Sequence, residues 1–398
     1  MRTKRKATRT ETKIHNKRLI LKTIYDQRRI SRADVARVTD LTPPTVSSIV
    51  AELLDDGLVE EVGQGPSKVG KPATLLSVAD DSRHLIGVDL AESEFRGCVV
   101  NLRGQVRHRF SLPMNDRDGE AALALVYELI DELVACSDCT LLGIGIGTPG
   151  LMDARRGMVR RAVNLNWEDL PLRDLLEERY HLPVYIANDC QVAALGEYVF
   201  GNSGVGSNLI VVKVGRGVGA GIVLNGQLHY GDGSGAGEIG HVVVMEGGVH
   251  CRCGRFGCLE TVASSSAIIG HARAIAQNNP NSSLHQYISS AADIDTNIVL
   301  QALEAGEEEL HQVIQVVGRH LGMAVANLVG VLNIHQIMIA GSVTCFGQPL
   351  LSSIRQEMQQ RALSALTAET QVDFSNLGLD IVNLGAASLV LSHELGLV

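Results

Sequence analysis

Two histidines, three cysteines and three glutamates stand within the 24 residues from 237 to 260. The spacing H-x9-C-x-C-x4-C brings three thiols and one imidazole close together, and such a set matches a closed, four-ligand zinc site. Glycines inside the run allow the tight turns that one shared ion requires. The sequence therefore predicts one structural zinc ion per chain, held by His241, Cys251, Cys253 and Cys258.

This ligand set leaves no open position for a metal-bound water, so it does not indicate catalytic zinc. The spacing also differs from that of a DNA-reading zinc finger, which favours a clamp for a loop over a recognition module. The alternative is a group of buried free cysteines without a metal. Another pair, Cys136 and Cys139, has the C-x-x-C spacing but no further ligands nearby in sequence, and we interpret both as ordinary residues.

The charge distribution divides the chain into a basic and an acidic part. The 398 residues carry a formal net charge of -9, but residues 1–77 have a charge of +6 and residues 78–398 one of -15. A basic module on an acidic body suggests a nucleic-acid partner for the first part. We expect a cytoplasmic protein without a membrane partner, because no long apolar run or leader-like segment is present.

The basic part has the pattern of a winged helix-turn-helix, predicted over residues 1–78. Residues 11–26 form an amphipathic helix, and Ser31, with Asp34 three residues on, marks the start of a second helix. Thr42 and the following proline start a third helix. Two short strands then flank the basic segment "GQGPSKVGKP", which reads as the wing.

The first 29 residues hold 11 basic and 2 acidic side chains, which suits phosphate contacts and double-stranded DNA as a partner. A small packing module is the alternative. We expect groove contacts from the third helix and phosphate or minor-groove contacts from the wing. The predicted DNA-binding residues are Thr45, Ser47, Ser48, Lys68 and Lys71.

From residue 84 the pattern changes to α/β. Apolar runs at 84–92, 95–102 and 106–112 predict strands, and a helix at 119–135 leads to a buried strand at 141–150. Residues 207–226 then predict two strands around a glycine-rich turn, before a long helix at about 309–331.

These patterns predict two lobes that follow the DNA-binding domain. The first lobe covers residues 79–190 and is completed by a C-terminal helix at about 380–398. The second lobe covers residues 191–379 and holds the zinc loop and dimerisation helices.

Four motifs resemble the ROK family of sugar kinases and sugar-responsive repressors. They are G-E-I-G-H at 237–241, C-x-C-G-x-x-G-C-L-E at 251–260, "GTPG" at 147–150 and "ND" at 188–189. A winged helix-turn-helix ahead of the body resembles the family's repressor branch, which includes the N-acetylglucosamine and glucose repressors. The resemblance implies an actin- or hexokinase-like, two-lobed α/β body.

The resemblance also implies a sugar site between the lobes. In the kinases, the positions of Asn188 and Asp189 hold the sugar and supply the base that deprotonates its hydroxyl. Asn164 corresponds to a further sugar-contacting asparagine, with Asn166 as a rival. A zinc-bound His241 could offer its second ring nitrogen to the sugar. The implied sugar-binding residues are Asn164, Asn188, Asp189, Glu238, His241 and Glu260.

Kinases of this family open the first lobe with D-x-G-G-T, whose glycines let the ATP phosphates approach the backbone. Here Asp89 is present, but Ala91, Glu92 and Ser93 replace the Gly-Gly-Thr run. Side chains obstruct the phosphates, and the carboxylate of Glu92 repels them. The glycine-rich turn at 215–221 remains, but packing alone can retain such glycines. We therefore expect no kinase activity and no catalytic residue.

The sequence thus predicts a sugar-responsive DNA-binding regulator, a repressor of carbohydrate genes in preference to an activator, with a sugar or sugar-phosphate effector. We expect a homodimer or a dimer of dimers on a DNA operator. Two alternatives stay open: an ATP-dependent sugar kinase with a fused DNA-binding domain, and a ROK regulator controlled by a partner protein.

Overall fold

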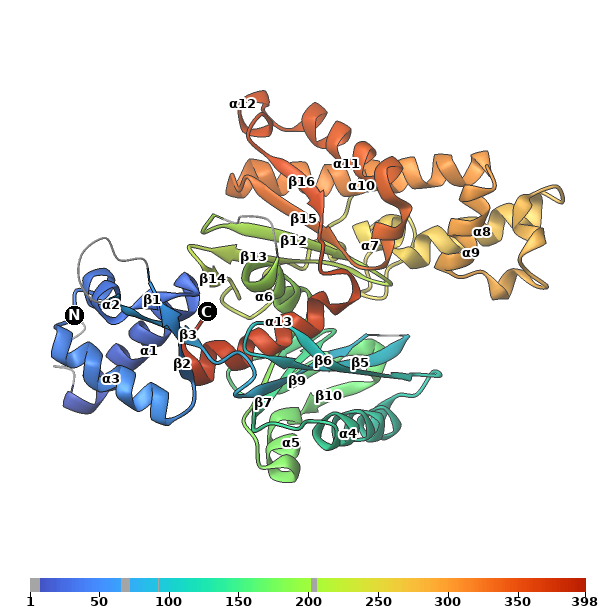
Figure 1. Cartoon of the computed structure of the whole chain (residues 1–398). Helices are drawn as coiled ribbons and strands as arrows, with labels where there is room; N and C mark the ends of the chain where they lie inside the picture. Colours follow the sequence, from blue (N-terminus) through green and yellow to red (C-terminus); the bar gives the residue numbers. More distant parts are fainter. Residues whose placement is uncertain (1–7, 66–71, 92, 202–205) are drawn as a thin grey trace.

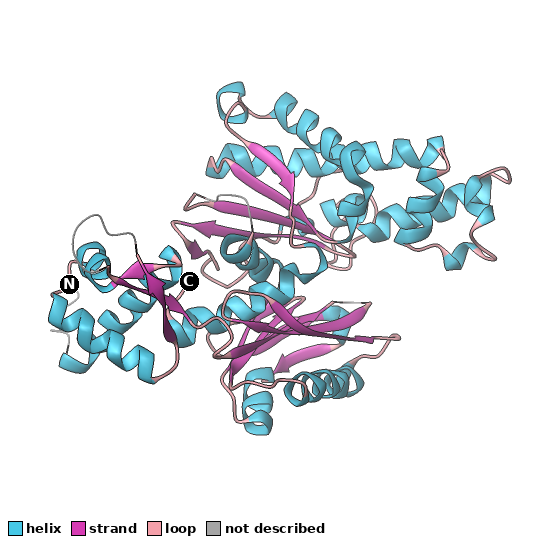
Figure 2. Ribbon diagram, in the orientation of Figure 1, coloured by secondary structure: helices cyan, strands magenta, loops and turns pink. Residues whose placement is uncertain are grey.

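The computed structural model describes residues 8–65, 72–91, 93–201 and 206–398. Figure 1 shows a small N-terminal module, drawn in blue, beside two larger lobes. Each lobe is built on a five-stranded sheet with helices against it (Figures 1 and 2). The predicted fold class, a winged helix-turn-helix followed by a two-lobed α/β body, is confirmed.

The N-terminal module combines three helices with a small antiparallel sheet of order β1-β3-β2. Its elements are α1 (Arg9–Gln27), β1 (Ile30–Ser31), α2 (Arg32–Thr39), α3 (Pro43–Asp55), β2 (Val59–Gln64) and β3 (Thr74–Val78).

The helix starts of this module follow from local hydrogen bonds. The hydroxyl of Thr8 accepts from the backbone N–H of Glu11 at 3.1 Å while the Glu11 carboxylate accepts from the N–H of Thr8 at 2.6 Å, a capping box that the sequence patterns did not predict. Ser31 caps α2 as predicted, accepting from the N–H of Asp34 at 3.2 Å. The Asp34 carboxylate, however, accepts from the Ser31 hydroxyl at 2.7 Å, so the reciprocal backbone bond of a full capping box is replaced.

The first lobe has a sheet of order β11-β7-β4-β5-β6, in which β11, β7 and β4 run parallel. A small sheet of order β10-β9-β8 accompanies it. The main-sheet strands are β4 (His84–Leu90), β5 (Glu94–Asn101), β6 (Val106–Pro113), β7 (Leu141–Thr148) and β11 (Val184–Asn188). The other elements are α4 (Gly119–Ala135), β8 (Leu151–Asp153), β9 (Met158–Ala162), β10 (Trp167–Leu170) and α5 (Leu172–Tyr180).

The second lobe has a sheet of order β14-β13-β12-β15-β16. Its strands are β12 (Leu209–Val214), β13 (Val218–Leu224), β14 (Gln227–Leu228), β15 (Gln336–Ala340) and β16 (Gln371–Phe374). Helix α6 (Asp189–Phe200) follows β11 and lies between the lobes, in contact with β7 of the first and with β12 and β13 of the second. The helices of the second lobe are α7 (Leu259–Ala263), α8 (Ser265–Asn278), α9 (Thr296–Glu304), α10 (Glu308–Leu332), α11 (Gly347–Arg361) and α12 (Ser364–Thr367).

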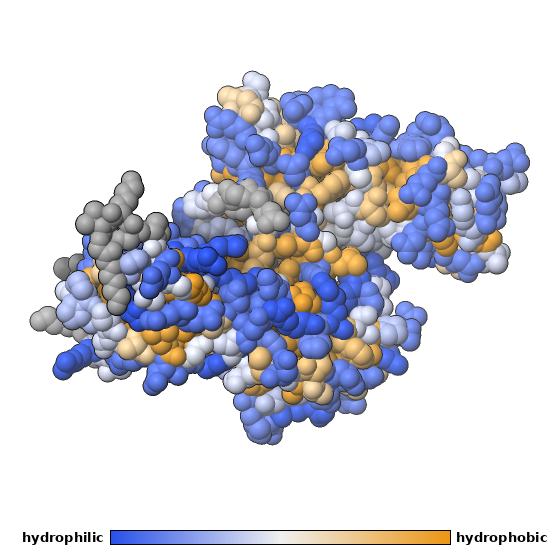
Figure 3. Space-filling model, viewed as in Figure 1, coloured by the Kyte–Doolittle hydropathy of each residue, from blue (hydrophilic) through white to orange (hydrophobic). Residues whose placement is uncertain are grey.

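Helix α10 is long and apolar enough to span a membrane by composition, but half of its most apolar window is buried within the protein. Leu310, Ile314, Val317 and Leu321 on this helix belong to the main apolar cluster of the second lobe. Such burial is what a core helix of a globular lobe requires. On the face seen in Figure 3, apolar residues gather in the middle of the molecule, between the two lobes.

The last helix, α13 (Ile381–Val390), contacts β4 and β7 of the first lobe as well as α6. A Cβ atom at Gly145 of β7 would stand 1.8 Å from the carbonyl oxygen of Ala386, so only glycine permits this approach. Where α13 packs on α6, the two lobes share an apolar cluster that contains Val192, Val211, Met338 and Val382.

The N-terminal module shares an apolar cluster with the first lobe. Ile20, Ile24 and Leu76 of the module lie in one buried cluster with Leu85 and Leu102 of the first lobe. The C-terminal segment also contacts the N-terminal module, because the Arg18 guanidinium donates a hydrogen bond to the carbonyl of His393 at 2.9 Å. The predicted division at residue 78 is therefore crossed by continuous packing, and the domain bounds stay a prediction.

Candidate effector and metal site

The four predicted metal ligands converge in the second lobe. The ligand atoms of His241, Cys251, Cys253 and Cys258 all lie within 4.8 Å of one another. His241 Nδ1 stands 3.6 Å from the sulfur of Cys251, and the sulfurs of Cys253 and Cys258 are 3.6 Å apart. This donor set fits a metal ion that prefers nitrogen and sulfur ligands.

Backbone hydrogen bonds shape the loop that carries these ligands. The N–H of Cys251 donates to the carbonyl of Arg255 at 2.7 Å, and the N–H of Val244 donates to that of Gly257 at 2.8 Å. Gly257 has a φ of +72°, and a Cβ atom there would lie 1.7 Å from the carbonyl oxygen of Met245. The turn therefore requires a glycine between two of the thiols.

The thiols of this loop differ in their electrostatic surroundings. The backbone N–H of Arg255 lowers the pKa of Cys253 to about 7, whereas burial raises the pKa of Cys258 to about 12. Burial also raises the pKa of Cys251. Two buried thiols that hold their protons can become thiolates when a cation compensates the charge, which is what a metal ion in the cluster would do.

Asn188 and Asp189 occupy the joint between β11 and α6. Asn188 Oδ1 accepts from the N–H of Cys190 at 2.9 Å, capping the helix, and its Nδ2 donates to the carbonyl of Gly150 at 3.1 Å. The Asp189 carboxylate accepts from the same N–H of Cys190 at 2.9 Å. Both residues are thus rigidly held at the end of a first-lobe strand.

Glu238, His241 and Glu260 lie around the metal loop on the second lobe. Partial enclosure by the protein raises the pKa of Glu238, the neighbouring His241 opposes this shift, and Asp189 and Glu260 add to it. The Glu260 carboxylate accepts from the backbone N–H of Val218 at 3.2 Å. Three of the predicted sugar-binding residues, Asp189, His241 and Glu260, are therefore close enough to Glu238 to shift its pKa.

Asn164 is tied to the metal loop. Its Oδ1 accepts from the guanidinium of Arg252 at 2.5 Å, which joins the first lobe to the segment between two of the cysteines. The rival Asn166 is exposed and has a φ of +52°, ending the short 3-10 helix Val163–Leu165. Of the two asparagines, Asn164 is the one linked to the other predicted site residues. Arg252 was missed by sequence reasoning, although its place between two ligands was a signal.

Lys213 is a second residue that sequence reasoning missed. Its Nζ lies 2.6 Å from Asp189 Oδ2, and the two side chains are only 17% and 14% exposed. The Asp189 carboxylate, together with that of Asp89, raises the pKa of Lys213 against the lowering effect of burial. A lysine inside the apolar strand β12 was the available signal, because such a charge is rarely buried unpaired.

Asp89 lies beneath this ion pair at the end of β4. It is 3% exposed, and its Oδ1 is buried without a hydrogen-bond partner. Burial raises its pKa to about 6, while the ammonium of Lys213 acts in the opposite direction. The carboxylates of Asp89 and Asp189 and the ammonium of Lys213 therefore influence one another electrostatically.

The segment for which the sequence predicts no phosphate loop follows directly. Ala91 and Ser93 flank Glu92, and Glu92 itself lies outside the described residues. In the second glycine-rich turn, a Cβ atom at Gly219 would stand 2.6 Å from the sulfur of Cys190, and one at Gly221 2.2 Å from the Cys190 carbonyl oxygen. These glycines are accounted for by the close packing of β13 on α6, so they do not by themselves indicate a nucleotide site.

The predicted DNA-contacting residues of α3 are accessible to different degrees. Ser47 and Ser48 are exposed, while Thr45 is half-buried and its hydroxyl is 2.9 Å from that of Thr42. The opposite face of α3 is packed in the module. The wing residues Lys68 and Lys71 lie outside the described residues.

Comparison with protein families places both parts of the chain. The ROK family model matches residues 85–393, and a model described as winged helix-turn-helix DNA-binding matches residues 15–60. The chain therefore belongs to the ROK family, and its architecture is that of a DNA-binding regulator.

Individual relatives agree with this class. The chain is 35% identical to the xylose repressor of Caldicellulosiruptor bescii over 386 residues, 96% of each protein. A crystal structure of a ROK family transcriptional regulator, a homologue of the Escherichia coli Mlc protein, is similar with a TM-score of 0.84 and 29% identity, covering 97% of this chain and 98% of that one. A glucokinase of Halalkalibacterium halodurans is 34% identical over 317 residues, 78% of this chain and 96% of the glucokinase.

Proposed function

We propose that this protein is a sugar-responsive transcriptional repressor of carbohydrate genes. The observation that carries the proposal is the full-length similarity to a xylose repressor, which extends over the DNA-binding module and both lobes. In this proposal Thr45, Ser47 and Ser48 contact the major groove, and Lys68 and Lys71 of the wing contact the phosphates or the minor groove.

The effector is proposed to bind between the lobes. Carboxylates, an amide and an imidazole are the groups that pair with the vicinal hydroxyls of a sugar. The proposed contacts come from both lobes, so a bound sugar would set the distance between them. The proposed sugar-binding residues are Asn164, Asn188, Asp189, Glu238, His241 and Glu260.

D-xylose is the first effector to test, since the similar repressor is named for it. Calorimetry with pentoses, hexoses, amino sugars and their phosphates identifies the ligand. Heat from none of them would favour the second candidate, a regulator controlled by a partner protein.

The metal of the four-residue cluster is proposed to be a structural Zn2+, one per chain. His241 would bind it through Nδ1, which faces Cys251, and would keep Nε2 for the sugar. Elemental analysis should find about one zinc per chain, and Cys258→Ser should lose it together with effector binding. Metal-free wild-type protein with normal effector binding would refute the assignment.

We propose that the protein is not a kinase. The Asp189 carboxylate, which would have to accept the sugar proton, is engaged by Lys213 and by the N–H of Cys190. The similar glucokinase is the observation that keeps a fused sugar kinase as a candidate. Incubation with ATP and the same sugars decides between them: turnover that Asp189→Asn abolishes would establish the kinase, and no turnover is expected.

The regulator is proposed to act in the cytoplasm as a homodimer or a dimer of dimers. Two winged modules would then contact half-sites about 34–36 Å apart or a multiple of that distance. Sedimentation of the protein on a duplex that it selects from a random pool measures both the assembly and the spacing. Selection of a single half-site by a monomer would contradict this part of the proposal.

A further inference from the structure

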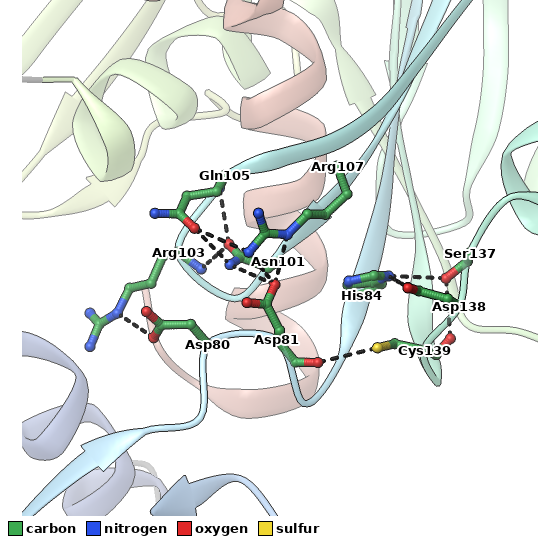
Figure 4. Close-up of polar contacts among 10 residues, drawn as sticks. All are labelled: Asp80, Asp81, His84, Asn101, Arg103, Gln105, Arg107, Ser137, Asp138 and Cys139. Atoms are coloured by element: carbon green, nitrogen blue, oxygen red, sulfur yellow. Dashed lines mark hydrogen bonds and ion pairs between the residues drawn. The ribbon is translucent and has the colours of Figure 1, made fainter. Parts of the chain in front are cut away.

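A second group of metal-ligand side chains lies about the junction between the N-terminal module and the first lobe. The ligand atoms of His84, Asp138 and Cys139 all lie within 4.8 Å of one another. Figure 4 shows His84 at the start of β4 facing Asp138 of the loop after α4, with the Cys139 thiol of the same loop pointing to the backbone oxygen of Asp81. We propose that these three residues form a second binding site for Zn2+ or a chemically similar divalent transition-metal ion.

The donor set suits such an ion in both geometry and charge. His84 Nδ1 is 3.6 Å from a carboxylate oxygen of Asp138, a distance compatible with two ligands of one metal. One imidazole, one carboxylate and one thiolate together carry two negative charges, so a divalent ion would form a neutral complex. Asp138 is 81% exposed, which leaves room for a water as the fourth ligand.

One member of the set is rigidly positioned. The His84 side chain is 3% exposed, and its Nδ1 lies 3.1 Å from the hydroxyl of Ser137. That hydroxyl lies 3.1 Å from the carbonyl of Cys139, to which it donates, so the metal-free imidazole donates from Nδ1. The other tautomer, with its proton on Nε2, would present the Nδ1 lone pair to a metal in place of the Ser137 hydroxyl.

Residues 79–83 form the linker between the N-terminal module and the first lobe. Metal binding at this site would replace one hydrogen bond of this linker by a metal–sulfur bond. The thiol of Cys139 donates to the backbone carbonyl of Asp81 at 3.2 Å. On binding Zn2+ the sulfur forms the metal–sulfur bond, its proton passes to solvent, and the hydrogen bond to Asp81 is lost. The Asp81 carboxylate of the linker would still accept hydrogen bonds from Arg107 and Asn101 (Figure 4).

The linker residue next to Asp81 connects this site to the DNA-binding module. Asp80 accepts from Arg103 at 3.0 Å, and the Arg103 guanidinium lies 4.1 Å above the ring of Tyr25 on α1. Arg103 also donates to the carbonyl of Tyr25 at 2.8 Å. The proposed ion would thus lie near Asp81, and the next residue, Asp80, holds the Arg103 side chain that contacts Tyr25 of the module.

Cys136 provides a matched control. It stands three residues before Cys139 in the C-x-x-C pattern, but its thiol points elsewhere and donates to the carbonyl of Leu133 at 3.4 Å. The structure therefore separates the two cysteines: only Cys139 belongs to the proposed site.

The test is a metal count on the full-length protein dialysed against buffered micromolar free Zn2+. Wild-type protein and Cys136→Ser should bind about two ions per chain, and Cys139→Ser and Asp138→Asn about one. Because Asp138 is exposed, its replacement keeps the test independent of folding. A Cd2+ titration of the metal-free proteins should produce more thiolate-to-metal absorption in wild type and Cys136→Ser than in Cys139→Ser, which keeps only the thiols of the four-residue cluster.

Wild-type protein that binds no more ions than Cys139→Ser would overturn the proposal. Loss of the second ion in Cys136→Ser but not in Cys139→Ser would overturn the ligand assignment. None of these outcomes depends on the effector or the operator, so they are separate from the proposed function.

Discussion

The first lobe meets its two neighbours in different ways. Its junction with the DNA-binding module is apolar, because Ile20 and Ile24 share one buried cluster with Leu85 and Leu102. Around the proposed effector site its contacts with the second lobe are polar, with Asp189 on Lys213 at 2.6 Å as the central pair. An apolar cluster also joins the lobes, and it includes Val192 of α6 and Val382 of α13.

This difference teaches which parts can move together. Apolar burial is lost whenever two surfaces separate, so the module should follow the first lobe as one body. Polar contacts can be exchanged for contacts with a ligand's hydroxyl groups at little net cost. A sugar between the lobes would therefore act on the polar junction, and the apolar junction would carry the change to the DNA.

The largest expected effect comes from removing the cation of the polar junction. Lys213→Met leaves the carboxylates of Asp89 and Asp189 mostly buried without their partner, which should lower the free energy of unfolding by about 3–5 kcal/mol. Denaturant unfolding measures this. The double variant Lys213→Met, Asp189→Asn should recover part of the loss, and an unaltered midpoint in the single variant would show that the pair is solvated.

The apolar junction is tested by a change in the module that is read out in the first lobe. Ile24→Ala removes a fully buried side chain and should cost about 2–5 kcal/mol. Trp167 is the single tryptophan of the chain and lies in the first lobe, where its Nε1 donates to Gly119. If the module and the first lobe unfold together, the fluorescence transition of Trp167 shifts; an unshifted transition would separate the two bodies.

Asp89 gives the polar junction a pH dependence. Its pKa is raised from 3.8 to about 6, so its contribution to stability is present below about pH 4 and is lost as the pH rises through 6. Ionisation in the fold costs roughly 3 kcal/mol at neutral pH. Asp89→Asn should therefore raise the free energy of unfolding at pH 7.5 and change it little at pH 4.5. An equal effect at both pH values would contradict the buried ionisation.

Much of this organisation follows from the sequence. The spacing of one histidine and three cysteines predicted that they lie together, since a loop of 18 residues offers few ways to separate them. The helix at Gly119–Ala135 has the predicted bounds because its apolar period continues to both ends. The return of α13 to the first lobe was implied by the family resemblance.

Contacts between distant residues could not be predicted. Lys213 and Asp189 are separated by 24 residues, and a single sequence does not say which carboxylate a buried lysine will face. In the sequence, His84 precedes α4 and Cys139 follows it, and only the fold brings the two residues together. From the sequence we interpret Cys136 and Cys139 as ordinary residues, and nothing in the C-x-x-C pattern indicates that Cys139 lies near a histidine.

The smallest expected effect concerns the bond between Arg252 and Asn164. It is partly exposed, so Arg252→Ala should change the free energy of unfolding by less than about 1 kcal/mol. Because the bond joins the lobes, the variant should still alter effector affinity several-fold. Calorimetry measures that change, and Arg255→Ala in the same loop is a control. Equal effects of the two variants would mean that the loop, and not the interlobe bond, is responsible.

The most direct test of the whole account is the affinity for an operator duplex, measured by fluorescence anisotropy with and without the sugar that calorimetry identifies. The account predicts that the sugar weakens DNA binding by about 5–150-fold, as expected for a coupling of about 1–3 kcal/mol, and that ATP adds nothing. DNA affinity that no sugar changes, or that changes only when ATP is present, would contradict it.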